Sequence, residues 1–387
     1  MKILLLLGSG ISIPTFGSDG DCTGLTRRIL EDEWYRATDA LYLHGTAPNQ
    51  HSDAIPIQML LKRLKYIAED YYRLRGNWQV TYEDLYYLID QIYNEESGGQ
   101  DNPAVVPFRD QIQTIALDIF TPSPVASFGN LRDLSYEAIN FIKCAVSYYL
   151  NVEEIPFGLD GLIELINSKE FGRIDTFTLN HDILLEQAFS IKTLKLNDGF
   201  EKENQYVRWY SPNLFDATDL PRIFKLHGSI NWRYMQNNDW GNIGIPCWTE
   251  HQKPLSPDGK NLYVEDPPII IAGTYNKERQ YYYDIIADMH WHFYSSLRNK
   301  STQLIVVTGY GWNDRSINGR LREWLLRSNE NKILLIHQHP ESVTKSKSFM
   351  NYDYKRLVEN KQLFVITKWP SELESGELVE KVKELMA

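Results

Sequence analysis

Side chains that could do chemistry gather in three short segments of this 387-residue chain. They are Gly8–Ser12, Thr178–Asp182 and Lys225–Ser229. A glycine turn lets backbone amides approach an anion such as a phosphate. An asparagine and an aspartate can orient a ligand by hydrogen bonds, and a histidine titrates near neutral pH, as a general base must. Together, the three segments could bind a phosphate-containing ligand and move a proton on it.

Each segment directly follows a short apolar run that predicts a buried strand. The runs are Ile3–Leu7, Ile174–Phe177 and Ile223–Leu226. In an open α/β sheet, ligands bind in the crevice outside the carboxyl ends of the strands. The three segments are therefore predicted to converge on one cleft.

Apolar runs and helical patterns alternate along much of the chain, which predicts a doubly wound, mostly parallel α/β sheet of Rossmann-like type. The predicted strands are Ile3–Leu7, Ile174–Thr178, Ile223–Leu226, Ile269–Ala272, Leu304–Thr308, Ile333–Ile336 and Leu363–Ile366. The predicted helices between them are Asp182–Phe189, Tyr281–Arg298 and Ser316–Arg327.

The stretch from about Thr26 to Ser168 has helical periodicity nearly throughout and predicts a large helical insertion after the first strand. We therefore expect a Rossmann-like domain of residues 1–27 and 168–387, and an inserted helical domain of residues 28–167. The region from Asn231 to Pro268 has little periodicity and predicts a loop-rich excursion that partly covers the cleft.

Composition narrows the class of protein. A net charge of −11 gives no sign of the excess of basic residues that direct nucleic-acid binding requires. The run Ile3–Leu7 is too short to span a membrane or to form the core of a secretory signal. Three scattered cysteines, Cys22, Cys144 and Cys247, argue against a disulfide framework and favour a reducing cytoplasm. The 13% of aromatic residues could fill a large core or serve contacts in a homo-oligomer.

The glycine turn leaves two interpretations open, a phosphate site formed by Gly8, Ser9, Gly10 and Ser12 or a simple tight turn. Ile13 stands where the third glycine of a dinucleotide fingerprint belongs, which disfavours a hydride-transferring dehydrogenase. The chain also lacks the glycine-rich motif of P-loop nucleotide hydrolases.

In order and residue type, the three motifs resemble those of the sirtuin (SIR2) family of NAD-consuming enzymes, and within it the branch associated with bacterial defence. Gly8–Ser12 is similar to the family turn G-A-G-x-S, Thr178–Asp182 to T-Q-N-I-D, and His227-Gly228 to H-G. The resemblance covers roughly residues 1–27 and 168–366. The helical insertion lies outside it.

The resemblance implies a catalytic role for Asn180, which would orient the nicotinamide ribose and place a water, and for His227, which would act as the base. It implies that Asp182 hydrogen-bonds the nicotinamide carboxamide and that Gly228 leaves room for the substrate. Simpler roles stay open, because Asn180 or Asp182 could cap the helix that begins near Ile183 and a lone histidine after a strand is often structural.

The segment Val307–Asp314 resembles a G-Y-S-x-x-D segment of divergent bacterial SIR2 domains, which places its glycines near the adenosine ribose or phosphate. Asp314 could cap the next helix and be purely structural. The further candidate contacts of the dinucleotide are Phe16, Gly309, Tyr310, Gly311, His337 and Gln338.

The chain departs from protein-deacylating sirtuins because it has no C-x-x-C pair to bind their structural zinc. His290 and His292 lie two apart in a helical pattern, so they face different directions and predict no metal site. The absence of zinc puts deacylation in doubt, since the same region builds much of the acyl-peptide groove.

The resemblance thus favours a cytoplasmic NAD+ glycohydrolase, with NAD+ as substrate and no zinc, that depletes NAD in bacterial anti-phage defence. A HerA-like ATPase, or else a short Argonaute, is the partner expected on family grounds. Two alternatives remain: a catalytically silent subunit that senses NAD or ADP-ribose, and a residual protein deacylase.

Overall fold

The computed structural model describes residues 2–17, 21–38, 40–48, 52–73, 79–98, 105–117, 119, 130–151, 155–238, 240–247, 255–256, 259–273, 281, 284–346 and 348–387. The chain divides into two compact units. The first unit consists of Met1–Gly17, Glu153–Tyr263 and Glu278–Ala387, and the second of Ser18–Val152 and Val264–Lys277. The division at residues 27 and 168 that the sequence suggests stays a prediction, because compactness alone does not define a domain that folds independently.

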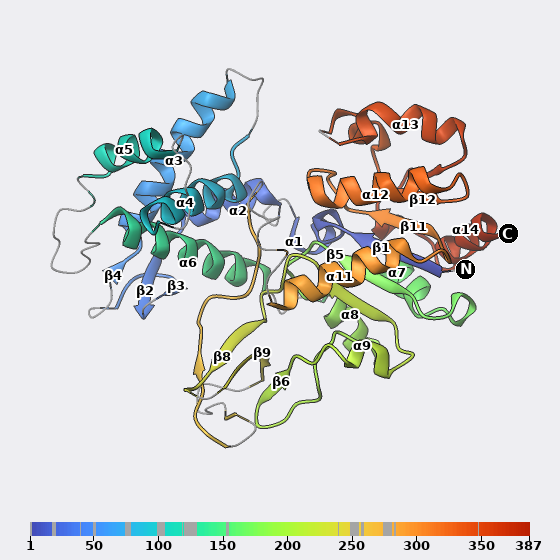
Figure 1. Cartoon of the computed structure of the whole chain (residues 1–387), viewed down its shortest axis with the longest axis horizontal. Coiled ribbons are helices and arrows are strands. Elements are labelled where there is room, and N and C mark those ends of the chain that lie inside the picture. Colours follow the sequence, from blue (N-terminus) through green and yellow to red (C-terminus); the bar gives the residue numbers. More distant parts are fainter. Residues whose placement is uncertain are drawn as a thin grey trace. The chain divides into compact units, whose positions relative to one another are not determined.

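Six parallel strands form the central sheet of the first unit, in the order β13-β12-β11-β1-β5-β7 (Figure 1). The strands are β1 (Lys2–Leu7), β5 (Asp175–Thr178), β7 (Arg222–Lys225), β11 (Thr302–Thr308), β12 (Lys332–Ile336) and β13 (Leu363–Ile366). Taken in chain order, they run outward from β1 in one direction and then return to its other side, which is the strand order of a Rossmann sheet. The predicted doubly wound α/β fold is confirmed.

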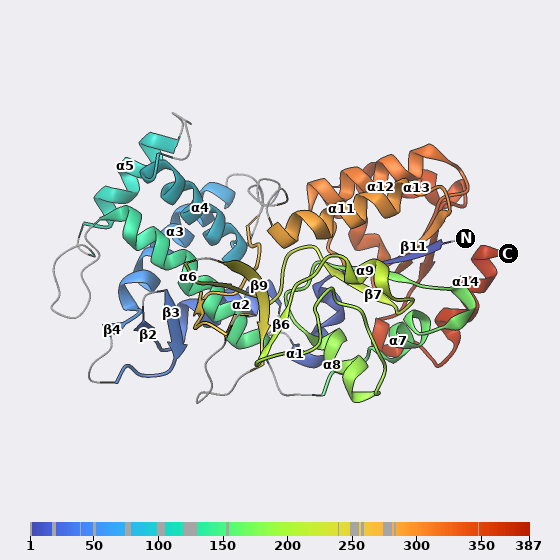
Figure 2. The same cartoon turned by 60° about the horizontal axis from the view of Figure 1, so that its bottom comes forward.

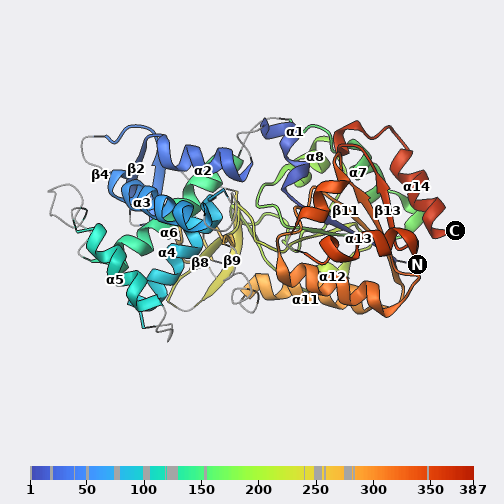
Figure 3. The same ribbon diagram turned by 90° about the horizontal axis from the view of Figure 1, so that it is seen from above.

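Helices cover both faces of this sheet, with α11 and α12 on one side and α7 and α8 on the other (Figure 3). Because both faces are covered, the strands are apolar on both sides, and Ile3 to Leu7 of β1 are at most 1% exposed. The helices of the first unit are α1 (Ile13–Phe16), α7 (Asp160–Ile166), α8 (Leu184–Ile191), α9 (Leu214–Ala217), α11 (Asp284–Arg298), α12 (Arg315–Arg327), α13 (Met350–Glu359) and α14 (Glu377–Met386).

A second, antiparallel sheet occupies the region that the sequence predicts to be a loop-rich excursion. Its order is β10-β8-β9-β6, and its strands are β6 (Val207–Trp209), β8 (Arg233–Gln236), β9 (Gly241–Pro246) and β10 (Tyr263–Val264). The loop prediction for Asn231 to Pro268 is thus wrong for β8, β9 and β10, whereas β6 precedes that region. β6, β8 and β10 have two to four residues, whereas β9 has six and contains two glycines. Gly244 of β9 is favoured because a side chain there would lie 2.7 Å from Val207.

The second unit is mainly helical, as predicted, but it also holds a small antiparallel sheet (Figure 2). Its helices are α2 (Cys22–Glu31), α3 (Ile55–Arg73), α4 (Tyr82–Glu96), α5 (Val105–Ile115) and α6 (Leu131–Leu150), and its strands are β2 (Trp34–Thr38), β3 (Leu41–His44) and β4 (Ser52–Asp53). The sheet is tied to α6 by Glu137, which pairs with Arg36 at 2.7 Å and accepts a hydrogen bond from Tyr42. The helical periodicity that the sequence shows nearly throughout this stretch does not predict these three strands.

The predicted strand Ile269–Ala272 is not a strand of any sheet among the described residues, and Ile270 alone forms a β-bridge there. Two prolines, Pro267 and Pro268, precede it and cannot donate to a strand ladder. The Ile270 amide donates instead to the Pro268 carbonyl at 3.1 Å. Ile270 and Ile271 are nevertheless buried, so their apolar character serves packing.

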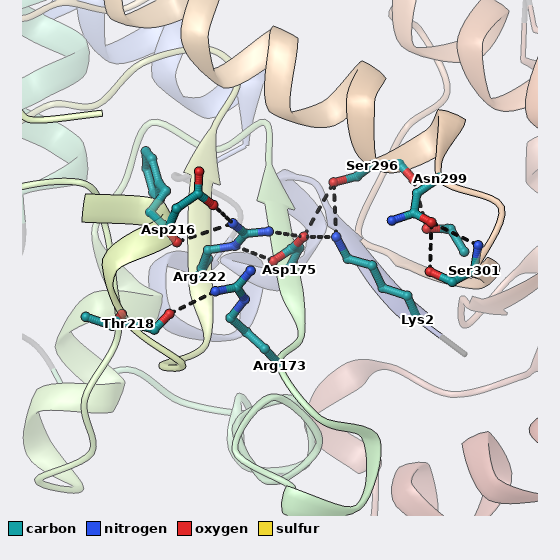
Figure 4. Close-up of polar contacts among 11 residues, drawn as sticks. Lys2, Arg173, Asp175, Asp216, Thr218, Arg222, Ser296, Asn299 and Ser301 are labelled. Carbon is teal, nitrogen blue, oxygen red and sulfur yellow. Dashed lines mark hydrogen bonds and ion pairs between the residues drawn. The ribbon is translucent and has the colours of Figure 1, made fainter. Parts of the chain in front are cut away.

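A buried ion cluster joins the first residues of three sheet strands (Figure 4). Asp175, which is fully buried at the start of β5, lies 2.6 and 2.7 Å from two guanidinium nitrogens of Arg222 at the start of β7. The ammonium of Lys2 at the start of β1 lies 2.5 Å from the same carboxylate. Burial alone would raise the pKa of Asp175, but the bonds and charges of Arg222 and Lys2 lower it below its ordinary value.

We expect Asp175→Asn to lower the free energy of unfolding by about 3–5 kcal/mol at pH 7, because it leaves two cations without their buried anion. Since the pKa of Asp175 is lowered by folding, its contribution is complete above about pH 4 and is lost as the pH falls further. The difference between the wild type and the variant should therefore shrink in acid, as measured by urea denaturation from pH 7 to pH 3.

Asp216→Asn is the matched control, because Asp216 also contacts Arg222, at 3.3 Å, but its side chain is 81% exposed. Its effect should stay within about 0.5 kcal/mol. An equal decrease in the free energy of unfolding of the two variants would show that the burial of Asp175 does not determine the effect.

Candidate functional site

The carboxyl ends of the six parallel strands form one row. Each terminal residue is the register partner of the next strand's terminal residue. In sheet order the row reads Ile366, Ile336, Thr308, Leu7, Thr178 and Lys225. The predicted motifs all follow this row directly, so the sheet brings them to the same edge of the first unit.

The glycine turn after β1 packs backbone against backbone on the turn after β11. A side chain at Gly8 would lie 2.5 Å from the Gly309 carbonyl oxygen, and one at Gly10 would lie 2.7 Å from the Gly309 Cα. Gly309 itself has φ +66°, and a side chain there would lie 2.6 Å from the Gly8 carbonyl oxygen. The three glycines are therefore required by a close approach of two turns at the point where the strand order reverses.

Several amides of this turn are engaged within the protein. The Gly10 amide donates to the Gly309 carbonyl at 2.9 Å, and the Ile11 and Ser12 amides donate to Gly8 and Ser9 at 3.1 and 3.0 Å. The amides of Gly10, Ile11 and Ser12 therefore do not form the expected row of donors that could bind a phosphate. Ser9 is exposed at the turn.

Ser12, Asn180 and Asp182 form one buried polar cluster between the turn after β1 and the loop after β5. The Asn180 side-chain amide donates to Ser12 Oγ at 2.9 Å, and Ser12 Oγ donates to Asp182 Oδ2 at 2.7 Å. All three residues are at most 6% exposed. Asn180 Oδ1 is buried and has no hydrogen-bond partner among the described residues, so this acceptor could take a donor from a ligand.

Asp182 also anchors the next helix, because its Oδ1 accepts the Leu184 amide at 3.1 Å at the start of α8. Thus Oδ1 of Asp182 accepts the helix amide, and Oδ2 of the same carboxylate belongs to the polar cluster. Beneath the loop, the buried ammonium of Lys225 donates to the Asp182 carbonyl and lies 3.1 Å from Glu186. The conformation of this loop is therefore held from β1, β7 and α8.

His227, directly beyond β7, belongs to a second buried cluster. Its Nε2 lies 3.1 Å from Asp314 Oδ2 and 3.3 Å from the Tyr281 hydroxyl. Tyr281 donates to the same carboxylate oxygen at 2.6 Å. His181, between Asn180 and Asp182, has its ring centroid 6.2 Å from that of His227, so the two clusters are neighbours.

His290 of α11 packs beneath this second cluster. Its ring stacks on Tyr281 at 3.7 Å between centroids, and its Nε2 donates to the Leu226 carbonyl at 3.0 Å. Burial, followed by the charge of His227, lowers the pKa of His290 to about 3, so it is neutral at neutral pH. As predicted, His292 faces elsewhere, against Phe215 and Phe224.

The other predicted contacts occupy varied positions on the same edge. Gly228 has φ +79° and follows His227 in a tight turn, whereas Gly311 lies in the segment between β11 and α12. The Tyr310 side chain is buried, and its hydroxyl donates to Asn318 Oδ1 at 3.0 Å, so it is engaged within the protein. Phe16, in α1, is half-buried.

His337 and Gln338 follow β12, which is separated from β1 by β11. His337 Nδ1 accepts the His339 amide at 2.9 Å, and burial lowers its pKa. Gln338 Oε1 is buried without a partner. These two side chains therefore lie on the predicted edge, two strands away from the Ser12 cluster.

Sequence reasoning missed one member of the site and understated another. Tyr281 appeared only as the start of a predicted helix, and no spacing rule connects it with His227. Asp314 was predicted as a possible cap, and it does cap α12, since its Oδ1 accepts the Ile317 amide at 3.0 Å. A helix cap that follows a strand on the ligand-binding edge is the signal that could have found it.

A separate cavity of the first unit, beside α8 and α9, is lined by Glu186, Lys195 and Arg208 among others. None of the predicted site residues lines it. We therefore place the candidate site at the strand ends, where the buried polar groups converge, and not in this cavity.

Residues 175–366 match the family model described as a SIR2-like domain. This match supports a SIR2-like family assignment. It covers just under half of the chain and includes β5 to β13, with the Asn180, His227 and Asp314 segments. Members of a SIR2-like family are generally NAD-dependent enzymes, and an NAD-related activity is the coarse function that the SIR2-like match supports.

Solved structures with similarity to the chain are mutant Sir2 homologues. One is in complex with 2′-O-acetyl ADP ribose (TM-score 0.37, 11% identity, 100% of this chain and 94% of that chain covered). Two others are in complex with ADP ribose (TM-scores 0.35 and 0.34, identities 11% and 13%, 100% of this chain and 93% of each of those chains covered). Among proteins with curated descriptions, none matches the sequence.

Two features are absent from the residues that the structure describes. Among them, no three His, Cys, Asp or Glu side chains gather as ligands of a metal ion would. In the same part of the chain, no helix has the length and apolar character needed to cross a membrane. The predicted absence of zinc stays a prediction.

We expect Gly309→Ala to destabilise the protein, because the new methyl group would meet the Gly8 backbone and the residue would keep a strained positive φ. Gly319→Ala is the matched control, since Gly319 lies in α12 with nothing within 4 Å of an added Cβ. Thermal denaturation should show that the free energy of unfolding falls by about 1–3 kcal/mol in Gly309→Ala and rises by up to about 1 kcal/mol in Gly319→Ala. A neutral Gly309→Ala would contradict the close approach of the two turns.

Proposed function

We propose that this protein is an NAD+ glycohydrolase, which cleaves NAD+ to nicotinamide and ADP-ribose. The observation that carries the proposal is the pair of neighbouring buried clusters, Ser12–Asn180–Asp182 and His227–Asp314, at the carboxyl edge of a Rossmann-like sheet. Buried Asn180 Oδ1 lacks a partner, so a ligand with a hydroxyl, amide or water donor fits there.

The SIR2-like match supports the roles that we assign. Asn180 would orient the nicotinamide ribose and a water molecule, and Asp182 would accept a hydrogen bond from the carboxamide. His227 would take the proton of the attacking water or of a ribose hydroxyl. The bond between C1′ and the nicotinamide nitrogen breaks, nicotinamide leaves with the electron pair, and the water oxygen bonds to C1′.

Water is proposed as the acceptor, rather than an acyl-lysine peptide, because the chain lacks the cysteine pairs of deacylating sirtuins. The corresponding region holds β8 and β9 of the small antiparallel sheet. Deacylation is therefore the disfavoured alternative.

In the cell, we propose that the reaction depletes NAD during bacterial anti-phage defence in the cytoplasm. Such an enzyme must be restrained before infection, and a homo-oligomer or a partner subunit would supply the restraint. A HerA-like ATPase is our first candidate for the partner, and a short Argonaute is the second. Nicotinamide release by the chain with and without each partner would test this.

His227→Ala should lower the rate of nicotinamide release at least 10²-fold because it removes the base, and Asn180→Ala should lower it about 10²-fold because it misplaces the reactants. Chromatography of nicotinamide and ADP-ribose, with the purified chain alone and with its candidate partner, measures both rates. Asn331→Ala is the control, because Asn331 is also buried and hydrogen-bonded, to the Trp324 carbonyl at 2.7 Å, but lies away from the site.

Thermal denaturation of each variant separates loss of the site from loss of the fold. NAD binding by calorimetry without turnover, alone and with the partner, would contradict the hydrolase and favour a subunit that senses NAD or ADP-ribose. Activity that survives both substitutions would contradict the assigned roles.

A further inference from the structure

We propose that Asp314 and Tyr281 are positioning residues that hold the His227 imidazole in one tautomer and orientation. Their geometry places Nε2–H toward the Asp314 carboxylate, and the other ring nitrogen then carries the lone pair that can accept a proton. The catalytic consequence rests on the proposed function, but the positioning itself does not.

The Asp314 carboxylate is fixed from two sides. Its Oδ1 accepts the Ile317 amide at the start of α12 at 3.0 Å. Its Oδ2 accepts the Tyr281 hydroxyl at 2.6 Å and lies 3.1 Å from His227 Nε2. A carboxylate bound by a helix terminus and a phenol has little freedom to turn, so it presents a defined acceptor to the imidazole.

The cluster excludes water and keeps the tyrosine protonated. The side chains of His227 and Asp314 are 5% and 8% exposed, and Tyr281 is 5% exposed. Burial and the charge of Asp314 raise the pKa of Tyr281 far above its ordinary value, so its hydroxyl remains a donor. An ionised carboxylate only accepts hydrogen bonds, so an Nε2 of His227 that pairs with it acts as the donor.

Among the described residues, four titratable side chains are seen to face His227. Asp314 approaches from the α12 terminus, Tyr281 from the segment before α11, His290 from α11, and His181 from the loop after β5. His290 is neutral, so it adds no full charge to the cluster. Of these four side chains, Asp314 is the carboxylate, and at 3.1 Å from Nε2 it would stabilise an imidazolium at His227.

In the proposed reaction, His227 would take a proton from the attacking water or a ribose hydroxyl. Asp314 would stabilise the resulting imidazolium without taking the proton itself. Tyr281 would keep the carboxylate oriented. Neither residue would touch the substrate, so both act through His227.

The test is ¹⁵N–¹H spectroscopy of histidine-labelled full chain across a pH titration, with His227→Gln to assign the signal. In the wild type, neutral His227 should be the Nε2–H tautomer. Asp314→Asn keeps the ability to cap α12 but removes the negative charge. It should mix the tautomers and lower the pKa of His227 by about one unit, a tenfold change in proton affinity.

Tyr281→Phe provides a second, independent variant. It should keep the Nε2–H tautomer, because the carboxylate remains, and should raise the pKa of His227, because one donor fewer shares that carboxylate. Asp353→Asn and Tyr294→Phe are the matched controls. Asp353 pairs with Arg322 of α12 at 3.0 Å, and the Tyr294 hydroxyl lies 3.2 Å from Ser316 Oγ of the same helix, so both contact α12 elsewhere.

An unchanged tautomer and pKa of His227 in Asp314→Asn would overturn the proposal, as would equal shifts in the controls. If NAD+ is cleaved, Asp314→Asn should lower the rate of cleavage at least tenfold. The acidic side of the pH–rate profile should move to lower pH, because the pKa of His227 falls. If NAD+ is not cleaved but the spectra change as expected, the proposed function fails and the positioning role stands.

Discussion

The fold of the first unit depends on a buried carboxylate that holds three strands together. Asp175 is bound by Arg222 and Lys2, and each of the three is the first residue of its strand. Such a cluster contributes little net stability, because desolvation offsets the attraction, but it strongly penalises any register that separates its members. Because the strands are short, a register fixed at their amino ends also fixes where their carboxyl ends lie.

The candidate site follows from this constraint. With the strand ends in one row, the glycine turn after β1 and the polar loop after β5 meet side by side, and Ser12 reaches both Asn180 and Asp182. On the other side of β1, the turn after β11 comes close enough to exclude any side chain at Gly309. The close packing of the turns after β1 and β11 thus forms the backbone of the site, and a small number of buried polar side chains complete it.

The sequence predicted the central sheet well because parallel strands buried on both faces are continuous apolar runs. Because the ends of these apolar runs mark the ends of the strands, the sequence also predicted the edge of the sheet on which Asn180 and His227 lie. The prediction failed at residues 269–272, because an apolar run that packs as an irregular segment has the same sequence pattern as a buried strand. The strands β2, β3 and β8 were not predicted because they are short and mostly half-exposed, and β9 was not predicted because glycine and proline interrupt its apolar pattern.

The part of the site that no pattern could predict is the contact between Tyr281 and Asp314, which lie 33 positions apart. Asp182 and Asp314 share one feature: each uses one oxygen for a helix amide, of Leu184 or Ile317, and the other for the site. Amide hydrogen exchange at the first turns of α8 and α12 is therefore a direct gauge of how often the site itself opens.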